Sequence, residues 1–341
     1  MRDVPESLIW LVKILVIFGA LVSTAGIMSL AERRVSAWMQ YRHGPNRVGP
    51  FGLLQPLADG IKFMFKEELV PEGANRLLFR LAPALAAMPA MMTIAVIPFG
   101  TTVLVGGREV PLSIAQLDVG ILYVLAIGGL SVYGVILGGW ASNSKYSLLG
   151  GLRASAQMIS YELSLILTML AVIAMSGTLD LRAVAESQDT TMLGFLPAWN
   201  VFKQPLAFAL FVIATFAETN RHPFDFAECE PELVGGFHTE YSSMKFALFF
   251  LGEYCAMIVM ACLTTTLFLG GSSVPFLADA HWVLGFGAFA AKTGFFLFLF
   301  IWVRWTLPRF RFDQLMHLGW KVFLPLALAN LLLTGAWIAW S

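Results

Sequence analysis

Residues 244–271 read MKFALFFLGEYCAMIVMACLTTTLFLGG, a nearly continuous apolar run with one acid, Glu253, inside it. A bilayer core about 30 Å thick requires roughly 20 apolar residues in a helix, so this run is long enough to cross a membrane. Similar runs occupy residues 8–30, 81–106, 119–141, 158–177, 201–217, 282–307 and 321–340. They are continuous rather than alternating, which disfavours transmembrane strands. The sequence therefore predicts an all-α polytopic membrane protein with eight transmembrane helices.

The composition supports a single membrane domain over residues 1–341. Of the 341 residues, 58% are apolar and only 13% are charged, and the mean hydropathy is +0.74. A soluble domain carries about 25% charged residues, so this chain lacks the charge to cover a soluble surface. The 22 basic and 22 acidic residues cancel, which gives nucleic acid no net field to bind. Three cysteines form no C-x-x-C pattern, so no metal site is predicted within the chain.

Lysine and arginine are unevenly distributed among the segments that connect the runs. Sixteen lie in or next to residues 31–80, 142–157, 218–243 and 308–320, and four lie on the opposite side. Basic residues favour the cytoplasmic side, so both termini are predicted to be periplasmic. An Ala-, Gly- and Leu-rich chain of this kind favours a bacterial inner membrane, or the mitochondrial inner membrane if the source is eukaryotic.

The first connecting segment, residues 31–80, contains the string FGLLQPLADGIKFMFKEE at about 51–68. Its apolar residues Leu57 and Ile61 recur at helical spacing, while Asp59 and Lys62 recur on another face. This pattern predicts an amphipathic helix on the cytoplasmic membrane surface. A plain surface anchor is the alternative reading of the same pattern.

The third connecting segment, residues 218–243, is acidic and also rich in aromatic residues. Its acids are Glu218, Asp225, Glu228, Glu230, Glu232 and Glu240. A solvated acidic loop would not require Phe224 or its aromatic neighbours, so we expect this loop to fold against the membrane domain or a partner. Crowded, partly buried carboxyl groups have raised pKa values, which suits groups that exchange protons near neutral pH.

Glu162, Glu253 and Lys292 are charged residues that lie well within the predicted spans. A charge at the centre of a bilayer costs roughly 2.5–3.5 kcal/mol on insertion scales, so such residues are usually functional or paired. A proton path is the favoured interpretation, and a buried pair of Glu253 with Lys292 is the alternative. Lys13 and Arg304 lie nearer the helix ends, where long side chains are expected to reach the interface.

Six strings are specific when they are taken together: AERR at 31–34, RHGPN at 42–46, GLLQPLAD at 52–59, GWASNSKY at 139–146, AETNRHPFD at 217–225 and PRFRFDQLM at 308–316. Through them the chain resembles, over essentially its whole length, the family of the H subunit of bacterial proton-pumping NADH:quinone oxidoreductase, respiratory complex I. The mitochondrial counterpart of that family is subunit 1.

The resemblance implies a membrane subunit of a translocase that forms much of the tunnel through which quinone, with ubiquinone the expected species, enters. It implies no complete catalytic centre and no bound cofactor in this chain, because the FMN and iron–sulfur clusters belong to partner subunits. The implied partners are the subunits that carry the quinone site and the terminal iron–sulfur cluster, neighbouring membrane-arm subunits and membrane lipid.

The resemblance also assigns roles to residues of this chain. The quinone-tunnel residues would be Arg33, Arg42, Asp59, Arg221, Phe224 and Asp225. The proton-path residues would be Glu162, Glu218, Asp225, Glu228, Glu230, Glu232, Glu240, Glu253 and Lys292. Two alternatives remain at this stage. One is the homologous membrane subunit of a respiratory hydrogenase, and the other is a stand-alone proton-coupled carrier, which the missing internal repeat disfavours.

Overall fold

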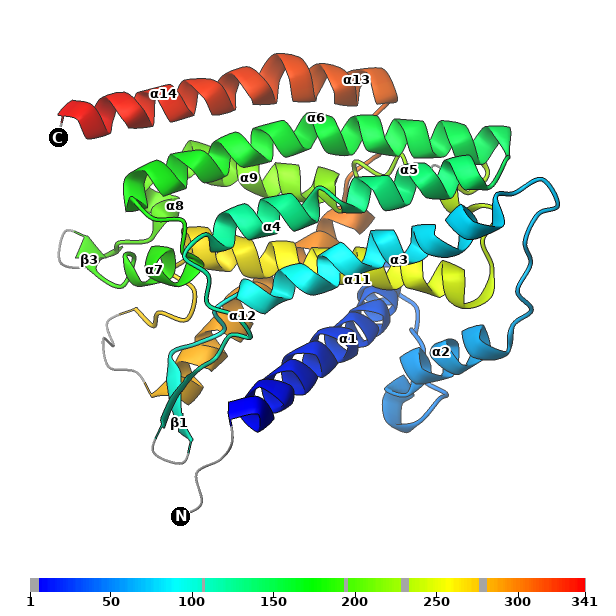
Figure 1. Ribbon diagram of the computed structural model, residues 1–341, viewed down its shortest axis with the longest axis horizontal. Helices are drawn as coiled ribbons and strands as arrows, with labels where there is room; N and C mark the ends of the chain where they lie inside the picture. Colours follow the sequence, from blue (N-terminus) through cyan, green and yellow to red (C-terminus); the bar gives the residue numbers. More distant parts are fainter. Residues whose placement is uncertain (1–5, 106–107, 193–195, 228–232, 276–280, 341) are drawn as a thin grey trace.

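The computed structural model describes residues 6–105, 108–192, 196–227, 233–275 and 281–340, and these form a bundle of long helices (Figure 1). The long helices and their extensions are α1 (Glu6–Met39), α3 (Arg76–Thr93), α4 (Gly120–Gly128), α5 (Ser131–Ala141), α6 (Lys145–Ser176), α9 (Pro205–Glu218), α11 (Ser243–Phe268), α12 (Trp282–Thr306), α13 (Phe312–His317) and α14 (Leu324–Trp340). The short helical elements are η1 (Pro50–Gly52), α2 (Gln55–Phe65), η2 (Ile94–Val96), α7 (Leu181–Glu186), α8 (Asn200–Lys203), η3 (Gly236–His238) and the π-helical turn η4 (Leu318–Phe323).

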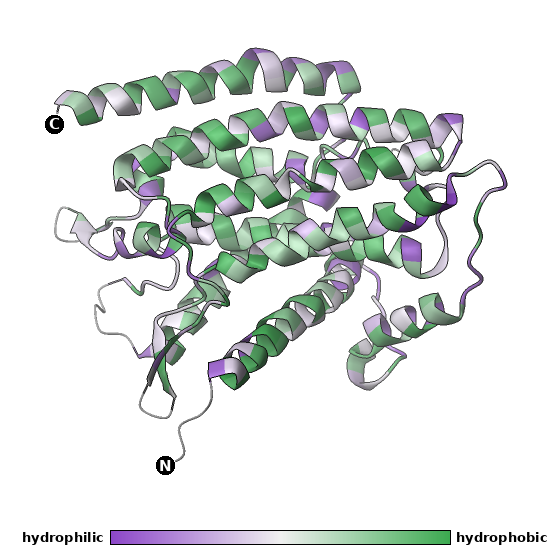
Figure 2. Ribbon diagram, viewed as in Figure 1, coloured by the Kyte–Doolittle hydropathy of each residue, from purple (hydrophilic) through white to green (hydrophobic). Residues whose placement is uncertain are grey.

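Strands are confined to two antiparallel hairpins in the part of the chain that the structure describes. One pairs β1 (Thr102–Val105) with β2 (Arg108–Pro111), and the other pairs β3 (Thr191–Met192) with β4 (Leu196–Pro197). Helix α1 begins, and α14 ends, at the end of the bundle where β1 and α7 lie, whereas α2 lies toward the opposite end (Figure 1). Hydrophobic residues run along the long helices, and hydrophilic residues gather mostly at their ends and in the loops (Figure 2).

The prediction of an all-α membrane protein is confirmed in its coarse form. Within the described residues, seven helical segments are long and apolar enough to cross a membrane, and Pro205–Glu218 is a shorter apolar helix. The predicted span 201–217 corresponds to two helices, the short α8 and the longer α9. Helix α9 begins at Pro205, directly after the break between them. The count of eight crossings therefore stays a prediction.

Several helix boundaries differ from the prediction. Helix α1 continues to Met39 and α6 begins at Lys145, so basic residues expected in loops lie on helices. No proline interrupts either extension, so the helix can continue through both. By contrast, the helical structure that begins at Arg76 ends at Val96 rather than at residue 106, because Pro98 and Gly100 follow and the chain then forms β1 and β2.

The predicted amphipathic segment contains helix α2, which covers Gln55–Phe65 rather than residues 51–68. Pro56 lies in the first turn of this helix, where proline is tolerated because no intrahelical bond to its nitrogen is needed. The apolar side chains of Leu57, Ile61 and Met64 are exposed. The position of α2 on a membrane surface stays a prediction.

Close backbone contacts fix the layer of helices that holds the interior polar residues. A Cβ atom on Gly134 of α5 would lie 2.3 Å from the backbone nitrogen of Ala86, and one on Gly252 of α11 would lie 2.9 Å from Cα of Ala87. Helix α3 is thus packed between α5 and α11 at residues that only glycine allows. This contact sets the position of Glu253, which follows Gly252.

Candidate functional site

A buried cluster of charged residues joins four distant parts of the chain. Nη1 of Arg221 lies 2.9 Å from Oε2 of Glu32, and its Nε lies 2.5 Å from Oε1 of Glu253. Arg304 of α12 forms a second ion pair with Glu32. The hydroxyl of Tyr254 donates a 2.6 Å hydrogen bond to Glu32, and its ring centre lies 4.5 Å from the Arg221 guanidinium.

The charges of this cluster balance one another in a site that is largely buried. The side chains of Arg221 and Glu32 are only 4% and 7% exposed. Burial by itself lowers the pKa of Arg221, but the carboxylates of Glu253 and then Glu32 outweigh it and raise that pKa, so the residue stays a cation. Two arginines facing two carboxylates satisfy the rule that buried charges must be paired.

A large cavity opens next to this cluster, between α1, α2, α11 and the end of α12. Its volume is about 1210 Å³. The predicted tunnel residues Arg33, Arg42 and Asp59 line it, and Nη1 of Arg33 lies 2.6 Å from Oδ2 of Asp59. Glu32, Tyr254 and Arg304 complete the charged part of the wall, while much of the remaining wall is apolar.

The other predicted tunnel residues do not line this cavity. Arg221 lies behind the wall and contacts two residues that do line the cavity, Glu32 and Tyr254. Phe224 is buried against Tyr161 and Phe310, with ring centres 5.2 and 5.5 Å away. Nη2 of Arg309 lies 2.8 Å from Oδ2 of Asp225. Phe224 and Asp225 therefore tie this loop to α6 and to the segment that follows α12.

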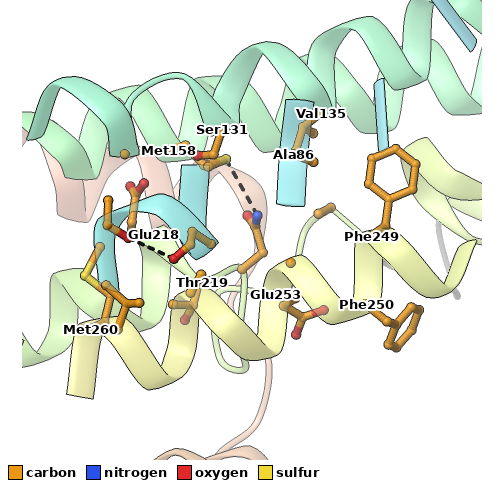
Figure 3. Close-up of a pocket in the computed structure, with 18 of the residues that line it drawn as sticks. Ala86, Ser131, Val135, Met158, Glu218, Thr219, Phe249, Phe250, Glu253 and Met260 are labelled. Carbon is orange, nitrogen blue, oxygen red and sulfur yellow. Dashed lines mark hydrogen bonds between the residues drawn. The ribbon is translucent and has the colours of Figure 1, made fainter. Parts of the chain in front are cut away.

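A smaller chamber of about 100 Å³ lies on the other side of α11 (Figure 3). Glu218 from the end of α9 and Glu253 from α11 both contribute to its wall, as do Ser131 and Thr219. Oε2 of Glu218 is buried and has no hydrogen-bond partner among the described residues. A proton on this carboxyl group would remove its buried charge, and water in the chamber, which has room for several molecules, would supply a hydrogen-bond partner.

Glu162 lies where the helix of residues 120–141 is interrupted. Helix α4 ends at Gly128 and α5 begins at Ser131. A Cβ on the intervening Gly129 would lie 3.0 Å from Oε1 of Glu162, so the carboxyl group is packed against the interruption. The structure thus arranges Glu253, Glu218 and Glu162 on three neighbouring helices.

The remaining predicted proton-path residues are less closely connected. Glu228, Glu230 and Glu232 lie outside the described residues. Glu240 lies in the turn after η3 and lines neither the cavity nor the chamber. Lys292 donates hydrogen bonds of 2.7, 3.1 and 2.7 Å to the carbonyls of Leu269, Gly271 and Ser273.

Glu253 and Lys292 therefore do not form the alternative pair, and each has other partners. Glu253 pairs with Arg221, and the Lys292 ammonium binds the carbonyls that follow α11, with the ring centre of Trp199 4.6 Å away. Cations favour the carboxyl ends of helices, where carbonyls lack intrahelical partners, so this contact stabilises the end of α11.

Sequence reasoning gave no role to Glu32, Tyr254 or the buried part of Arg304. Glu32 stands within the quoted string AERR, and Tyr254 directly follows Glu253, so both signals were present. Arg304 was expected to extend to the interface, but its partner Glu32 is buried. In the described parts of the chain, no three His, Cys, Asp or Glu side chains are grouped to hold a metal ion.

Known proteins resemble this chain over nearly its full length. The family described as NADH dehydrogenase matches residues 12–335. The chain is 54% identical to the H subunit 1 of NADH-quinone oxidoreductase from Geobacter metallireducens, over 97% of this chain and 96% of that protein. It is 54% identical to the H subunit from Thermomicrobium roseum (96% and 95% covered) and 48% identical to the H subunit 1 from Cytophaga hutchinsonii (90% of each).

Proposed function

The chain belongs to the NADH dehydrogenase family and is a subunit of NADH-quinone oxidoreductase, and on this premise we propose that it binds quinone and relays protons. The cavity of about 1210 Å³ is the proposed access path for quinone. The row Glu253, Glu218 and Glu162 is the proposed first part of the path that couples quinone reduction to proton pumping.

One observation carries this proposal: the cavity and the chamber of carboxyl groups are joined by one buried ionic cluster. Glu32 lines the cavity, Glu253 lines the chamber, and Arg221 contacts both carboxylates. A change of charge in the cavity would therefore act on Glu253 through two short ion pairs in a region of low dielectric.

The walls of the cavity suit a molecule with a polar head and an apolar tail. Ligand pockets usually measure about 300–1,000 Å³. This cavity is larger, so it has room for a long ligand. Val22, Ile27 and Leu57 offer apolar surface, whereas Arg33 and Asp59 supply polar groups at another part of the wall. Exposed apolar residues of α2 would let the lipid phase reach the opening.

The chemistry follows from the nature of a quinone. A quinone takes up electrons and protons together as it is reduced, so its reduction changes the charge balance around it. The electrons would come from an iron–sulfur cluster of a partner subunit, and FMN would also belong to a partner. The described chain would supply the path, the charged cluster and the carboxyl groups, and Arg221 would shift its contacts between Glu32 and Glu253 as the charge changes.

We place the chain in an inner membrane as a multi-pass protein with both termini on the periplasmic side. The bias of basic residues toward one set of loops supports this orientation. The partners would be the hydrophilic-arm subunits at the end where α2 lies, neighbouring membrane-arm subunits and lipid. Cysteine probes at Tyr41 and Thr101, which lie toward opposite ends of the bundle, should label from opposite faces of the membrane; labelling from one face would contradict this orientation.

The decisive experiment replaces Glu253 by Gln in the intact enzyme. The amide keeps the size and can still hydrogen-bond, but it cannot titrate. We expect an assembled enzyme with impaired NADH:quinone turnover and proton uptake, and with unchanged NADH oxidation by an artificial acceptor that does not use the quinone path. Glu186→Gln is the matched control, because Glu186 is exposed and pairs only locally with Arg182. Normal pumping by Glu253→Gln would contradict the proposal.

A further inference from the structure

Two hollows with charged walls lie on opposite sides of one aromatic residue. Among the described residues, Phe250 is the only one that lines both the large cavity and the small chamber. Tyr254, four residues later on α11, lines the cavity alone, and Glu253 lines the chamber alone. The wall between the two hollows is therefore one residue thick at Phe250.

Other aromatic rings support this wall from both sides. The ring centre of Phe246 lies 4.7 Å from that of Phe250, and the ring of His238 lies 5.9 Å away. Phe246 in turn contacts Phe63 of α2, with ring centres 5.9 Å apart. The contacts link α2 to the turn that contains η3, so the ring of Phe250 is held in place rather than projecting freely.

The position of this ring matters because water conducts protons. A continuous file of water between the hollows would let protons pass without using the ionic cluster. Apolar constrictions prevent such files, because water leaves a narrow passage that offers it no hydrogen bonds. A benzyl side chain offers none, whereas Glu253 and Arg221 offer several.

We propose that Phe250 is a hydrophobic barrier that keeps the water of the cavity apart from the water of the chamber. The barrier confines exchange between the two hollows to the residues Glu32, Arg221 and Glu253. The effect of the barrier on proton coupling rests on the proposed function. The barrier itself does not, because it concerns only whether water and small molecules can pass from the cavity into the chamber.

Access is measured directly with a thiol in the chamber. Ser131 lines the chamber and not the cavity, so Ser131→Cys places a thiol behind the barrier. In the intact enzyme, N-ethylmaleimide should label this cysteine several-fold faster when Phe250 is changed to Ala. The matched control is Phe249→Ala, because Phe249 lines the chamber alone and its loss should leave the rate at residue 131 unchanged.

Equal labelling rates with Phe250 and with Ala at that position would overturn the barrier, as would an equal rise in the Phe249→Ala control. If Phe250→Ala does not assemble, Phe250→Leu retains an apolar side chain without the ring and should give a smaller rise. Proton uptake per NADH oxidised should fall in Phe250→Ala. If labelling rises and this ratio does not fall, the barrier stands and the proposed proton path through Glu253 fails.

Discussion

Nη1 of Arg221 lies 2.9 Å from Oε2 of Glu32, a residue 189 positions earlier in the chain, and both side chains are buried. The contact ties the loop after α9 to the middle of the cavity wall. Because Arg221 also contacts Glu253, a single guanidinium neutralises parts of two carboxylates on α1 and α11. Removing that cation would leave buried negative charge on both helices.

Removing the Arg221 guanidinium should be strongly destabilising. Arg221→Met leaves the carboxylate of Glu253 without this counterion in a buried site, and breaking a buried pair in this way costs about 3–5 kcal/mol. We expect little assembled enzyme in this variant, measured as the amount of intact enzyme extracted in mild detergent.

The same reasoning predicts a rescue. Glu253→Gln removes the charge that Arg221→Met exposes, so the double variant should assemble better than Arg221→Met alone. Glu32 keeps its contacts with Arg304 and Tyr254 in both variants. A double variant that assembles no better than the single one would show that the charge of Glu253 is not what destabilises it.

Glu253 could be recognised from the sequence alone, whereas Glu32 could not. The depth of Glu253 within an apolar run indicated a carboxyl group that needs a partner or a proton, and depth can be counted along one helix. Glu32 precedes two arginines near the end of a run, which indicates a solvated helix end. Its burial comes from partners 189 and 272 residues away, and no local pattern contains that information.

Lys292 shows the same limit in another form. Its position within a span correctly indicated that it needs a partner, because an ammonium in the membrane is costly. The partners are backbone carbonyls that follow α11, and every residue type has such a carbonyl. The sequence therefore predicted the need for a contact but not its identity, and a nearby acid, Glu253, was the natural alternative.

Asp225→Asn should show whether the contact of Asp225 with Arg309 is needed for quinone-linked activity or only for assembly of the enzyme. The change weakens the contact of Asp225 with Arg309, and hydrogen bonds to charged groups contribute about 1.5–3 kcal/mol. We expect lower NADH:quinone activity and proton uptake in membranes, with NADH oxidation by an artificial acceptor largely unchanged. Parallel loss of both activities would indicate failed assembly, and full retention of both would remove Asp225 from the mechanism. Glu228→Gln should behave alike, although Glu228 lies outside the described residues.

The ion pair of Glu68 with Lys245 should give the subunit a pH-dependent stability. The hydrogen bond and charge of Lys245 lower the pKa of the Glu68 carboxyl group. A group whose pKa is lowered by folding stabilises the fold above its unfolded pKa of about 4.3, and that stabilisation is lost as the pH falls through the lowered pKa.

Glu68→Gln should therefore lower the thermal stability at pH 7, and its effect should shrink only as the pH falls below about 4, toward the lowered pKa. Because half of the Glu68 side chain is exposed, the effect should stay below about 1 kcal/mol. The measurement is the unfolding midpoint of the purified enzyme at a series of pH values. A difference between parent and variant that does not shrink toward acid pH would contradict the assignment.

Gly129→Ala tests Glu162 without changing an ionisable group. The new Cβ would lie 3.0 Å from Oε1 of Glu162, so the carboxyl group must move by a few tenths of an ångström. If Glu162 relays protons, this displacement should reduce quinone-linked proton uptake, and Glu162→Gln should reduce it further. Gly294→Ala on α12 is the control, because a Cβ there meets no atom within 4 Å and should leave proton uptake unchanged.

The double variant Gly129→Ala with Glu162→Gln decides whether the two changes act through the same group. Residues in contact are not additive when one acts through the other, so adding Gly129→Ala to Glu162→Gln should produce no further loss of proton uptake. An additional loss of similar size in both backgrounds would mean that the alanine acts by stiffening the interruption between α4 and α5. Glu162 would then be a neighbour of the sensitive element, and the relay would have to run from Glu218 by another group.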